Sequence, residues 1–595
     1  MDVFYEKLHG DPTRSFQNRI DGILDDLVHT GDLTKKELQF LKVDNPVIPT
    51  FYTLPKIHKN LQHPPGRPIV AGIGSLTALM STFVDYFIRP LAEAAPSFIK
   101  DTGHLLSVIE MANPLLKDEI ILVSLDVNAL YTSIPHDGGL EALEYFLSKR
   151  DNSPNPSINC ILELVKLILT CNYFLFQDAW FLQKRGVAMG SPFAPSFANI
   201  YMAHFEERYI YTNKRFTPHI ALWKRYIDDV FLLWCGDINT LQDFFNYLNN
   251  CTDYLSFSMD FDSTRISFLD VWVIREDNTL YTDLFTKPTA RNSLLRADSC
   301  HPLPLKNSLP YSQFCRVKRI CSRESDYERN RSMMESKFRA RGYKSSQITS
   351  ANDKIKNRPR SDLLRLKQKK KEEPAIMFST CYSKCSEQLK NIINRYWYIL
   401  KSDINLGDTF KNPPRIVYKR GKNLRDMLVH SDLPPLMKPP KSVLAPIPDG
   451  NRKCGSCAQC NYTYKCITYK HPHTGKSIPI KGIITCNTRS VIYLITCPCG
   501  KSYVGKTSRE LKVRIAEHRS TIQCKNLNYP VAAHFVEAGH SVSALRYIGI
   551  EKVSLPRRGG NLARLLSQRE NYYIHFLRTL TPFGLNVEFE LKCFL

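Results

Sequence analysis

Residues 225–231, which read RYIDDVF, restrict the fold of this chain more than any other stretch. The adjacent carboxylates Asp228 and Asp229 stand within a run of aromatic and β-branched residues, which is typical of a buried strand. An unpaired carboxylate in such a place is costly or has a shifted pKa. A bound divalent cation would offset both charges, so the sequence predicts a cation site with a further ligand elsewhere in the chain.

A third carboxylate, Asp126, follows another apolar run, EIILVSLDV. Considered alone, Asp126 is interpreted as a residue that caps a turn. If the two apolar runs are neighbouring strands, however, Asp126 and Asp228 meet around cations. Two cations roughly 3.5–4 Å apart activate a 3′-hydroxyl and stabilise a leaving pyrophosphate. We therefore expect a nucleotidyl-transfer site that uses Mg²⁺ or Mn²⁺.

The formal net charge of +24 indicates the kind of partner. A chain this basic is expected to bind a polyanion, most often nucleic acid, rather than a membrane surface. No run of 18 or more apolar residues predicts a membrane span, and the first 20 residues lack a secretory signal pattern. We expect an intracellular protein whose 18 cysteines are thiols or metal ligands rather than disulfides.

The order of these motifs resembles that of reverse transcriptases. Asp126 matches the metal-binding aspartate of the first palm motif, and YIDD matches the third. RGVAMGSPFAPSFANI resembles the second, with Gly190 at its turn and Met189 where many relatives carry glutamine. Tyr131 matches the aromatic residue that excludes a 2′-hydroxyl by its bulk. The resemblance implies an RNA template and deoxynucleoside triphosphates as partners.

Basic residues upstream and downstream extend the same resemblance. TLPKIHKN and GRPIVAG are similar to the fingers motifs, and they imply that Lys56 and Arg67 hold the triphosphate. Fixed positive charge on the transferred group suits that role. Residues 267–273 and 284–302 resemble the late palm and primer grip, and residues 309–323 resemble a thumb whose basic side chains face the duplex.

The C-terminal region contains a second ordered set of polar residues. Two tyrosines lie on predicted hairpin strands, an arginine and a histidine four residues apart share a helix face, and a glutamate lies on a later amphipathic helix. The set is Tyr493, Tyr503, Arg514, His518, Glu570 and Asn586. It resembles the GIY-YIG endonuclease family, with VIY in place of GIY and YVG in place of YIG. The alternative is a set of structural tyrosines with a solvated arginine.

The GIY-YIG resemblance implies a role for each of these residues. Glu570 would bind one Mg²⁺ ion, and Arg514 would bind the scissile phosphate. Tyr493, Tyr503 and His518 would position or deprotonate the attacking water, and Asn586 would support the site. A metal ion and a guanidinium both offset the negative charge that develops on a phosphodiester.

Cysteine spacing predicts a zinc site just before this region. CGSCAQCNYTYKC has the C-x-x-C spacing that suits tetrahedral Zn²⁺, with unligated reduced thiols as the alternative. The predicted ligands are Cys454, Cys457, Cys460 and Cys466. A second group could form its own site or complete the first, because spacing does not pair them. That group is Cys497, Cys499, His534 and His540.

We predict an α+β multidomain fold: a right-hand polymerase of fingers, palm and thumb, followed by a small mixed α/β nuclease domain. The predicted segments are a helical segment 1–45, fingers and palm 46–290, thumb and basic connector 291–400, linker 401–450, cysteine-rich zinc segment 451–485 and nuclease domain 486–595. The basic connector, residues 325–374, is expected to be flexible or helical, and it either binds nucleic acid or is a solvated linker. Its KQKKK run predicts import into the nucleus.

A reverse transcriptase followed by a GIY-YIG nuclease resembles the Penelope-like retroelement proteins, whose polymerases are similar to telomerase catalytic subunits. That resemblance implies that the nuclease nicks target DNA and that the freed 3′-hydroxyl primes copying of the element RNA. One alternative is a telomere-extending enzyme. Another is a domesticated or truncated copy that binds nucleic acid without full activity. The oligomeric state is left open.

Overall fold

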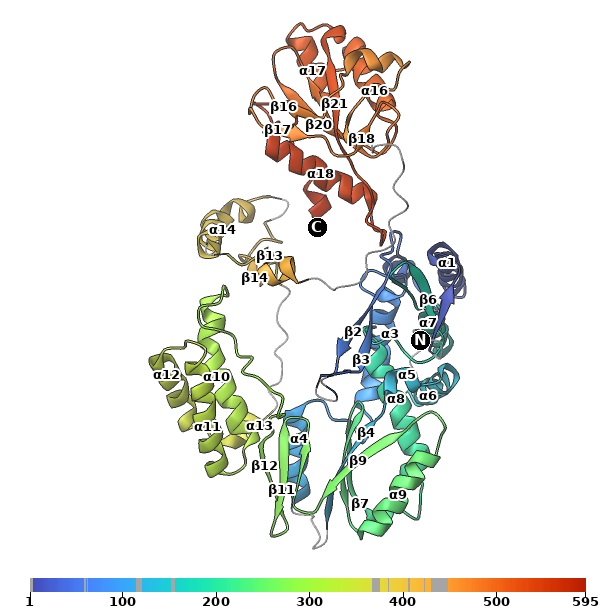
Figure 1. Ribbon diagram of the computed structural model, residues 1–595, viewed down its shortest axis with the longest axis vertical. Helices are drawn as coiled ribbons and strands as arrows, with labels where there is room; N and C mark the ends of the chain where they lie inside the picture. The colour runs from blue at the N-terminus through green and yellow to red at the C-terminus, as the bar shows by residue number, and fades with distance from the viewer. Residues whose placement is uncertain are drawn as a thin grey trace.

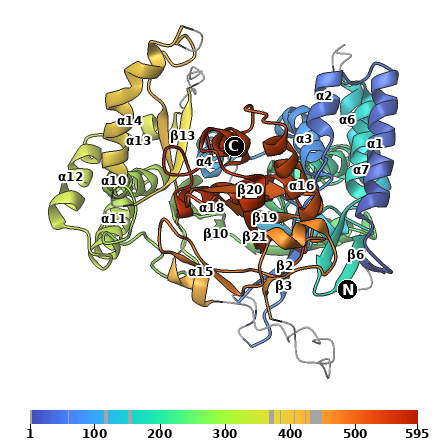
Figure 2. The ribbon, with the colours of Figure 1, turned by 90° about the horizontal axis from the view of Figure 1, so that it is seen from above.

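The computed structural model describes residues 4–594, apart from 58–59, 61, 114–119, 151–155, 366–374, 384, 405–406, 422 and 430–447. Figure 1 shows the fingers and palm on one side, a helical thumb on the other, and the C-terminal domain above them. Figure 2 gives the view from above, with the C-terminal domain in the middle. Within the described residues, no helix has the length and apolar character needed to cross a bilayer.

The palm is built on an antiparallel sheet with strand order β7-β8-β4-β9. Its strands are β4 (Ile121–Val127), β7 (Ile220–Tyr226), β8 (Asp229–Trp234) and β9 (Phe257–Asp262). Alternate residues of β4 face opposite sides: Val123 packs into the main core, and Leu122 packs into a second cluster with α4. Because both of their faces are covered, the two central strands, β4 and β8, are apolar at most positions.

The helices of the N-terminal half pack around this sheet and the fingers. They are α1 (Thr13–His29), α2 (Lys35–Leu41), α3 (Ala78–Glu93), α4 (Thr102–Ala112), α5 (Leu130–Ser133), α6 (His136–Ser148), α7 (Ile158–Thr170), α8 (Ala194–Phe205) and α9 (Ile238–Asn250). The π-helical turn η2 (Glu206–Tyr211) continues α8, and the short turn η3 (Thr217–His219) precedes β7.

The fingers contain a five-stranded sheet with order β1-β6-β5-β2-β3. The strands are β1 (Tyr5–Leu8), β2 (Thr50–Pro55), β3 (Gly66–Ala71), β5 (Tyr173–Phe176) and β6 (Ala179–Gln183). The prediction of a purely helical segment 1–45 is wrong at its start, because β1 pairs with β6 and Tyr5 lies opposite Gln183. Aromatic packing explains this strand, since the Tyr5 ring meets those of Phe51 and Phe174 edge to face.

The thumb follows a three-stranded sheet formed by β10 (Arg265–Phe268), β11 (Val271–Glu276) and β12 (Thr279–Leu284). Its helices are α10 (Leu303–Ile320), α11 (Glu324–Arg339), α12 (Ser345–Lys356) and α13 (Arg360–Leu364). The connector expected over 325–374 is helical as far as α13, but this part is packed into the thumb rather than being a separate connector, because Phe338 and Ile355 enter a buried core with Phe314. The KQKKK run lies outside the described residues.

A small unit follows the thumb and contains β13 (Met377–Cys381), α14 (Ser386–Lys401), β14 (Arg415–Lys419) and α15 (Leu424–Leu428). β13 and β14 are parallel, and α14 forms the crossover between them. The predicted linker 401–450 therefore includes a paired strand and a helix. Most of its proline-rich part lies outside the described residues.

The C-terminal domain has a central antiparallel sheet with order β20-β19-β21. Its elements are β15 (Gly450–Asn451), η4 (Ala458–Tyr462), β16 (Thr468–Lys470), β17 (Ser477–Pro479), β18 (Ile483–Ile484), β19 (Val491–Thr496), β20 (Ser502–Thr507), α16 (Leu511–Gln523), α17 (Pro530–Glu537), η5 (Val542–Ala544), β21 (Arg546–Lys552), α18 (Leu562–Leu577) and η6 (Leu591–Phe594). The predicted boundary at residue 485 does not separate two cores, because Ile478 and Ile484 pack with Ile548.

Candidate active sites

The palm carboxylates meet at one edge of the sheet. Asp126 lies directly opposite Asp229 in the β4–β8 register, so the two side chains point to the same face. Ile227 and Asp228 form the two-residue turn between β7 and β8, with Ile227 at a φ of 59°. The Val127 amide donates to the Asp228 carbonyl at 3.0 Å, which ties the turn to β4.

The electrostatics of this edge show an excess of negative charge. Burial, followed by the charges of Asp228 and Asp126, raises the pKa of Asp229 to about 6, and Lys287 acts in the opposite direction. A divalent cation would relieve this repulsion, so the residues present fit the ion that the sequence predicts. Lys287, in the loop after β12, is a neighbour that the sequence motifs did not indicate.

The residues predicted to bind the nucleotide lie around the same edge. Burial and the negative charge of Asp228 raise the pKa of Tyr131 to about 12, while the charge of Arg67 lowers it. Tyr131 therefore lies near groups from both palm and fingers. Arg67 is exposed on β3 opposite Leu54, and Lys56 follows the end of β2, where its amide donates to the Pro65 carbonyl at 2.8 Å.

Gly190 is required by a close approach between palm and fingers. Its φ is +123°, and a Cβ at this position would lie 2.5 Å from the Val70 carbonyl oxygen. The neighbouring Met189 carbonyl accepts a hydrogen bond from the Val70 amide at 3.0 Å. The second palm motif is therefore attached to β3, the strand that carries Arg67.

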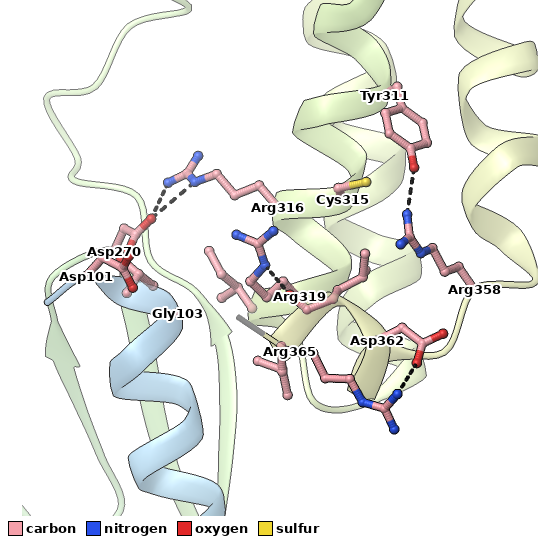
Figure 3. A pocket seen from close by; sticks show the side chains of 14 residues that line it. Asp101, Gly103, Asp270, Tyr311, Cys315, Arg316, Arg319, Arg358, Asp362 and Arg365 are labelled. Carbon is pink, nitrogen blue, oxygen red and sulfur yellow. Dashed lines mark hydrogen bonds and ion pairs between the residues drawn. The ribbon is translucent and has the colours of Figure 1, made fainter. Parts of the chain in front are cut away.

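A pocket of about 550 Å³ lies between palm and thumb, away from the three carboxylates (Figure 3). Four arginines line it: Arg316, Arg319, Arg358 and Arg365. Arg316 is paired with Asp270 at 2.5 Å, and Arg358 donates to the Tyr311 hydroxyl at 2.8 Å. Arg316 therefore connects α10 of the thumb to the turn between β10 and β11, whereas the bond from Arg358 to Tyr311 lies within the thumb.

The C-terminal set comes together around the buried Tyr493 of β19. The Tyr493 hydroxyl lies 2.9 Å from His518 Nε2, and Arg514 Nε donates to the same hydroxyl at 3.1 Å. Burial, and then the charge of Arg514, lower the pKa of His518 to about 3, so its imidazole is neutral. The Tyr503 ring lies 5.6 Å from that of His518. Gly505 leaves room for Tyr493, whose hydroxyl would be 2.5 Å from a Cβ there.

Asn586 supports this arrangement from the edge of β20. Its side-chain amide donates to the Val504 carbonyl at 2.8 Å, and its side-chain oxygen accepts from the Val504 amide at 3.0 Å. Val504 lies between Tyr503 and Gly505, so Asn586 acts as a strand partner at the point where the tyrosine is placed. This contact agrees with the supporting position expected for Asn586.

Glu570 of α18 lies near the same site and forms an ion pair with Lys506. Lys506 Nζ lies 3.0 Å from Glu570 Oε2, contacts Glu590 and donates to Ser567 Oγ at 2.7 Å. Burial raises the pKa of Glu570, and Lys506 lowers it. The negative charge of Glu570 raises the pKa of Tyr503, which places the carboxylate near that tyrosine. The sequence did not indicate Lys506 or Glu590.

The first zinc prediction is wrong in one ligand. The ligand atoms that lie within 4.8 Å of one another belong to Cys454, Cys457, Cys460 and Cys486. Cys466 instead pairs through its backbone with Asn451. The Cys460 sulfur lies 3.5–3.6 Å from the other three, and sulfurs bound at ~2.3 Å around zinc are a little under 4 Å apart. The set therefore fits a tetrahedral ion.

A second group of possible metal ligands is separate from the first group of four cysteines. Cys497, Cys499, His534 and His540 place one ligand atom each within 4.8 Å of the others. His534 Nε2 lies 3.3 Å from the Cys497 sulfur and 3.2 Å from the Cys499 sulfur. His540 Nε2 is buried and has no hydrogen-bond partner among the residues that the structure describes, which also fits a metal ligand.

Comparison with known proteins supports the polymerase. Residues 74–266 match the reverse transcriptase (RNA-dependent DNA polymerase) family, and residues 293–352 match the animal helix-turn-helix domain. The first match contains Asp126, Tyr131, Gly190, Asp228 and Asp229. This part of the chain is a reverse-transcriptase-like domain in a polymerase-like fold of mixed helix and sheet. No curated protein matches the chain.

The chain is also similar, at low identity, to several solved polymerases. Telomerase from Candida albicans, in complex with a fragment of telomeric RNA, is 11% identical over 66% of this chain and 70% of its own, with a TM-score of 0.40. Truncated apo telomerase from Candida tropicalis is 13% identical over 40% and 54%, with a TM-score of 0.32. The RNA-dependent RNA polymerase of a human picobirnavirus is 10% identical over 52% and 59%, with a TM-score of 0.36. The chain thus spans about half the length of the truncated telomerase.

Proposed function

We propose that the chain is an RNA-directed DNA polymerase. The observation that carries this proposal is the meeting of Asp126, Asp228 and Asp229 at one sheet edge, within the part of the chain that matches reverse transcriptases. These three carboxylates would hold Mg²⁺ or Mn²⁺, which supplies activation of a primer 3′-hydroxyl and charge stabilisation at the pyrophosphate. RNA template, primer and deoxynucleoside triphosphates are the corresponding partners.

The remaining side chains have roles that follow from their places. Lys56 and Arg67 stand on the fingers hairpin, where they bind the triphosphate oxygens. Tyr131 faces the same space and excludes a nucleotide with a 2′-hydroxyl. Lys287 lies on the other side of Asp229, where its positive charge balances part of the carboxylate charge.

Primer extension on an RNA template tests the polymerase proposal. Asp228→Asn keeps the shape of the side chain but removes its charge, so we expect extension to be lost. Asp260→Asn on the neighbouring strand β9 is the matched control and should extend primers at the wild-type rate. Extension by the Asp228→Asn protein at that rate would exclude Asp228 from the reaction.

We infer that the C-terminal domain is a DNA-nicking endonuclease that resembles the GIY-YIG family. Tyr493, His518 and Arg514 form one hydrogen-bonded cluster, and Glu570 lies nearby on α18. The Tyr493 hydroxyl is hydrogen-bonded to neutral His518, and these two residues, with Tyr503, would position or deprotonate the attacking water. Arg514 would bind the scissile phosphate. Glu570 would hold one Mg²⁺ ion, which supplies Lewis-acid stabilisation of the leaving oxygen.

Nicking of supercoiled DNA tests the endonuclease. Glu570→Ala should abolish nicking and leave primer extension unchanged, because the two sites lie in separate cores. Glu588→Ala, near the end of the same domain, serves as the control. Metal-dependent nicking at the wild-type rate by Glu570→Ala would remove this residue from the site.

Together these activities support target-primed reverse transcription by a Penelope-like retroelement protein. One site nicks target DNA, and the freed 3′-hydroxyl primes copying of RNA in the other. Such a protein works in the nucleus. The experiment combines protein, RNA template, supercoiled DNA, deoxynucleotides and magnesium, and we expect new cDNA to be covalently joined to nicked DNA.

One observation favours a second candidate function. Lys506 already neutralises Glu570, which is consistent with a C-terminal domain that binds DNA without cutting it. In that case the chain is a polymerase, or a domesticated copy, that uses primers made elsewhere. Nicking by the wild-type protein, and its loss in Glu570→Ala, distinguishes the two candidates.

A further inference from the structure

The segment between β21 and α18, residues 553–561, contacts the fingers far away in the sequence. In Figure 1 it is the red-orange strand that runs down from the C-terminal domain to the blue N-terminal elements. It reads VSLPRRGGN and carries two arginines followed by two glycines. We call it the docking segment.

Hydrogen bonds connect the docking segment to the chain just before β2. The Ile48 amide donates to the Arg558 carbonyl at 2.9 Å, and Arg558 Nε donates back to the Ile48 carbonyl at 2.7 Å. Val47 and Gly559 form an antiparallel bridge beside this pair. Two residues on each side therefore meet, through backbone groups and through the guanidinium of Arg558.

The contact requires a glycine at position 559. Its φ is +78°, and a Cβ here would lie 2.9 Å from the Pro46 carbonyl oxygen. Any larger residue is thus opposed by both backbone conformation and contact. Arg557 adds an ion pair with Asp178, in the turn between β5 and β6. Both side chains are about half exposed, so this ion pair adds little to the free energy of docking. Its main effect is on how the docking segment is oriented against the fingers.

The contacted residues lie at the base of the hairpin that bears Lys56 and Arg67. Ile48 is buried in the main core, and the Val47 amide donates to the Gly74 carbonyl at 2.8 Å. β2 begins two residues later, at Thr50, and leads directly to Lys56. The docking segment is therefore held at the fixed end of the element that meets the nucleotide.

We propose that residues 553–561 dock the C-terminal domain onto the fingers, and that this intramolecular interface couples the two proposed active sites. The docking stands on the contacts alone, whereas the coupling rests on the proposed function. A docked domain holds a DNA end at a restricted distance and orientation from the palm, which raises its effective concentration there. A domain joined only by the chain would release the same end into solution.

The test uses the full chain and one glycine variant with a matched control. Gly559→Val introduces a side chain against Pro46. Gly539→Val changes a glycine of the same domain that also has a positive φ, +65°, but has nothing within 4 Å of its Cβ position. A second series tests the ion pair with Arg557→Glu, Asp178→Arg and the double variant. Each single variant places two like charges together, and the double variant restores an ion pair with the two charges exchanged.

Amide hydrogen exchange of peptides over 46–50 and 553–561 reports docking without any activity. We expect slow exchange in the wild type and in Gly539→Val, and fast exchange in Gly559→Val. The double charge variant should exchange more slowly than either single variant. Equal exchange in wild type and Gly559→Val would overturn the docking, whatever the enzymatic results.

The coupling is then measured on the same proteins. Gly559→Val should nick plasmid and extend a supplied primer as the wild type does, but yield about ten-fold less cDNA joined to nicked DNA. If Gly559→Val shows fast amide exchange in the docking segment but yields as much cDNA joined to nicked DNA as the wild type, the proposed coupling is wrong. If the wild type neither nicks nor extends, the proposed function fails, while the exchange result still decides the docking.

Discussion

Arg225 and Glu206 form an ion pair in which Nε lies 2.6 Å from Oε1 and neither side chain is exposed to solvent. Arg225 is the last residue but one of β7, just before the carboxylate turn, and Glu206 opens the π-helical turn after α8. Arg225 also donates to the Ile227 carbonyl at 3.1 Å. The pair thus attaches the turn that carries Asp228 to the helix of the second palm motif.

This pair leads to a prediction about stability. Arg225→Met leaves the carboxylate of Glu206 buried without its partner, and the loss should be about 3–5 kcal/mol of unfolding free energy. Glu206→Gln keeps a hydrogen-bond acceptor and should cost less. Urea unfolding followed by the fluorescence of the palm tryptophans measures both. Equal losses in the two variants would mean that the charge of the pair is unimportant.

Asp229 makes the stability of the metal-free protein dependent on pH. Its pKa of about 6 lies above that of an unfolded aspartate, ~3.9, so the folded state binds more protons between these values. Stability without metal should therefore fall as the pH rises from about 4 through 6.

The Asp229→Asn variant checks that sign. It should match the wild type near pH 4 and be more stable above pH 6 in the presence of a chelator, by up to about 2–3 kcal/mol. Magnesium should reduce the difference by stabilising the wild type alone. Thermal unfolding across this pH range measures the effect, and a difference that does not vary with pH would contradict it.

Tyr131 should control the choice of sugar. Tyr131→Ala removes the ring that faces Asp228 and Arg67, so incorporation of ribonucleotides relative to deoxynucleotides should rise by about ten-fold or more. Tyr131→Phe keeps the ring and is the control. Single-nucleotide incorporation measures both ratios, and an unchanged ratio in Tyr131→Ala would show that another residue excludes the 2′-hydroxyl.

The cysteine sites predict a defined metal content. We expect two zinc ions per chain, one in each cysteine-containing group. Cys486→Ser should lower the content to about one, and Cys466→Ser should leave it at two, because the Cys466 sulfur lies outside both groups. Elemental analysis of the purified wild type and of both variants measures the number of zinc ions per chain. A loss of zinc in Cys466→Ser alone would contradict the ligand set.

The sequence was most informative where residues act within one turn or one strand pair. RYIDDVF was interpreted as part of one buried strand, whereas the structure places Ile227 and Asp228 in a turn and begins β8 at Asp229. Asp126 comes to the same sheet edge as expected, and its direct partner in the register is Asp229. Five of the six C-terminal residues likewise lie on strands and helices that the local pattern indicated, whereas Asn586 lies in the loop after α18. Their assigned roles stay predictions.

The sequence was least informative where distant segments meet. Cys466 was predicted as a ligand because it lies in the same short stretch as the other three cysteines. Pairing of β15 with β18 instead brings Cys486, which the spacing did not indicate, to the other three sulfurs. The charged segment after residue 325 was interpreted as a connector because its apolar residues are few, yet those few are enough to fill the core of the thumb.

By itself, the sequence determined which segments form apolar strands and which polar residues end them, because side-chain alternation and turn chemistry act over a few residues. Only the tertiary structure decided which carboxylates, sulfurs and arginines share a site. Those contacts join residues far apart in the chain, and their free energy depends on burial and geometry that exist only after the sheets have paired.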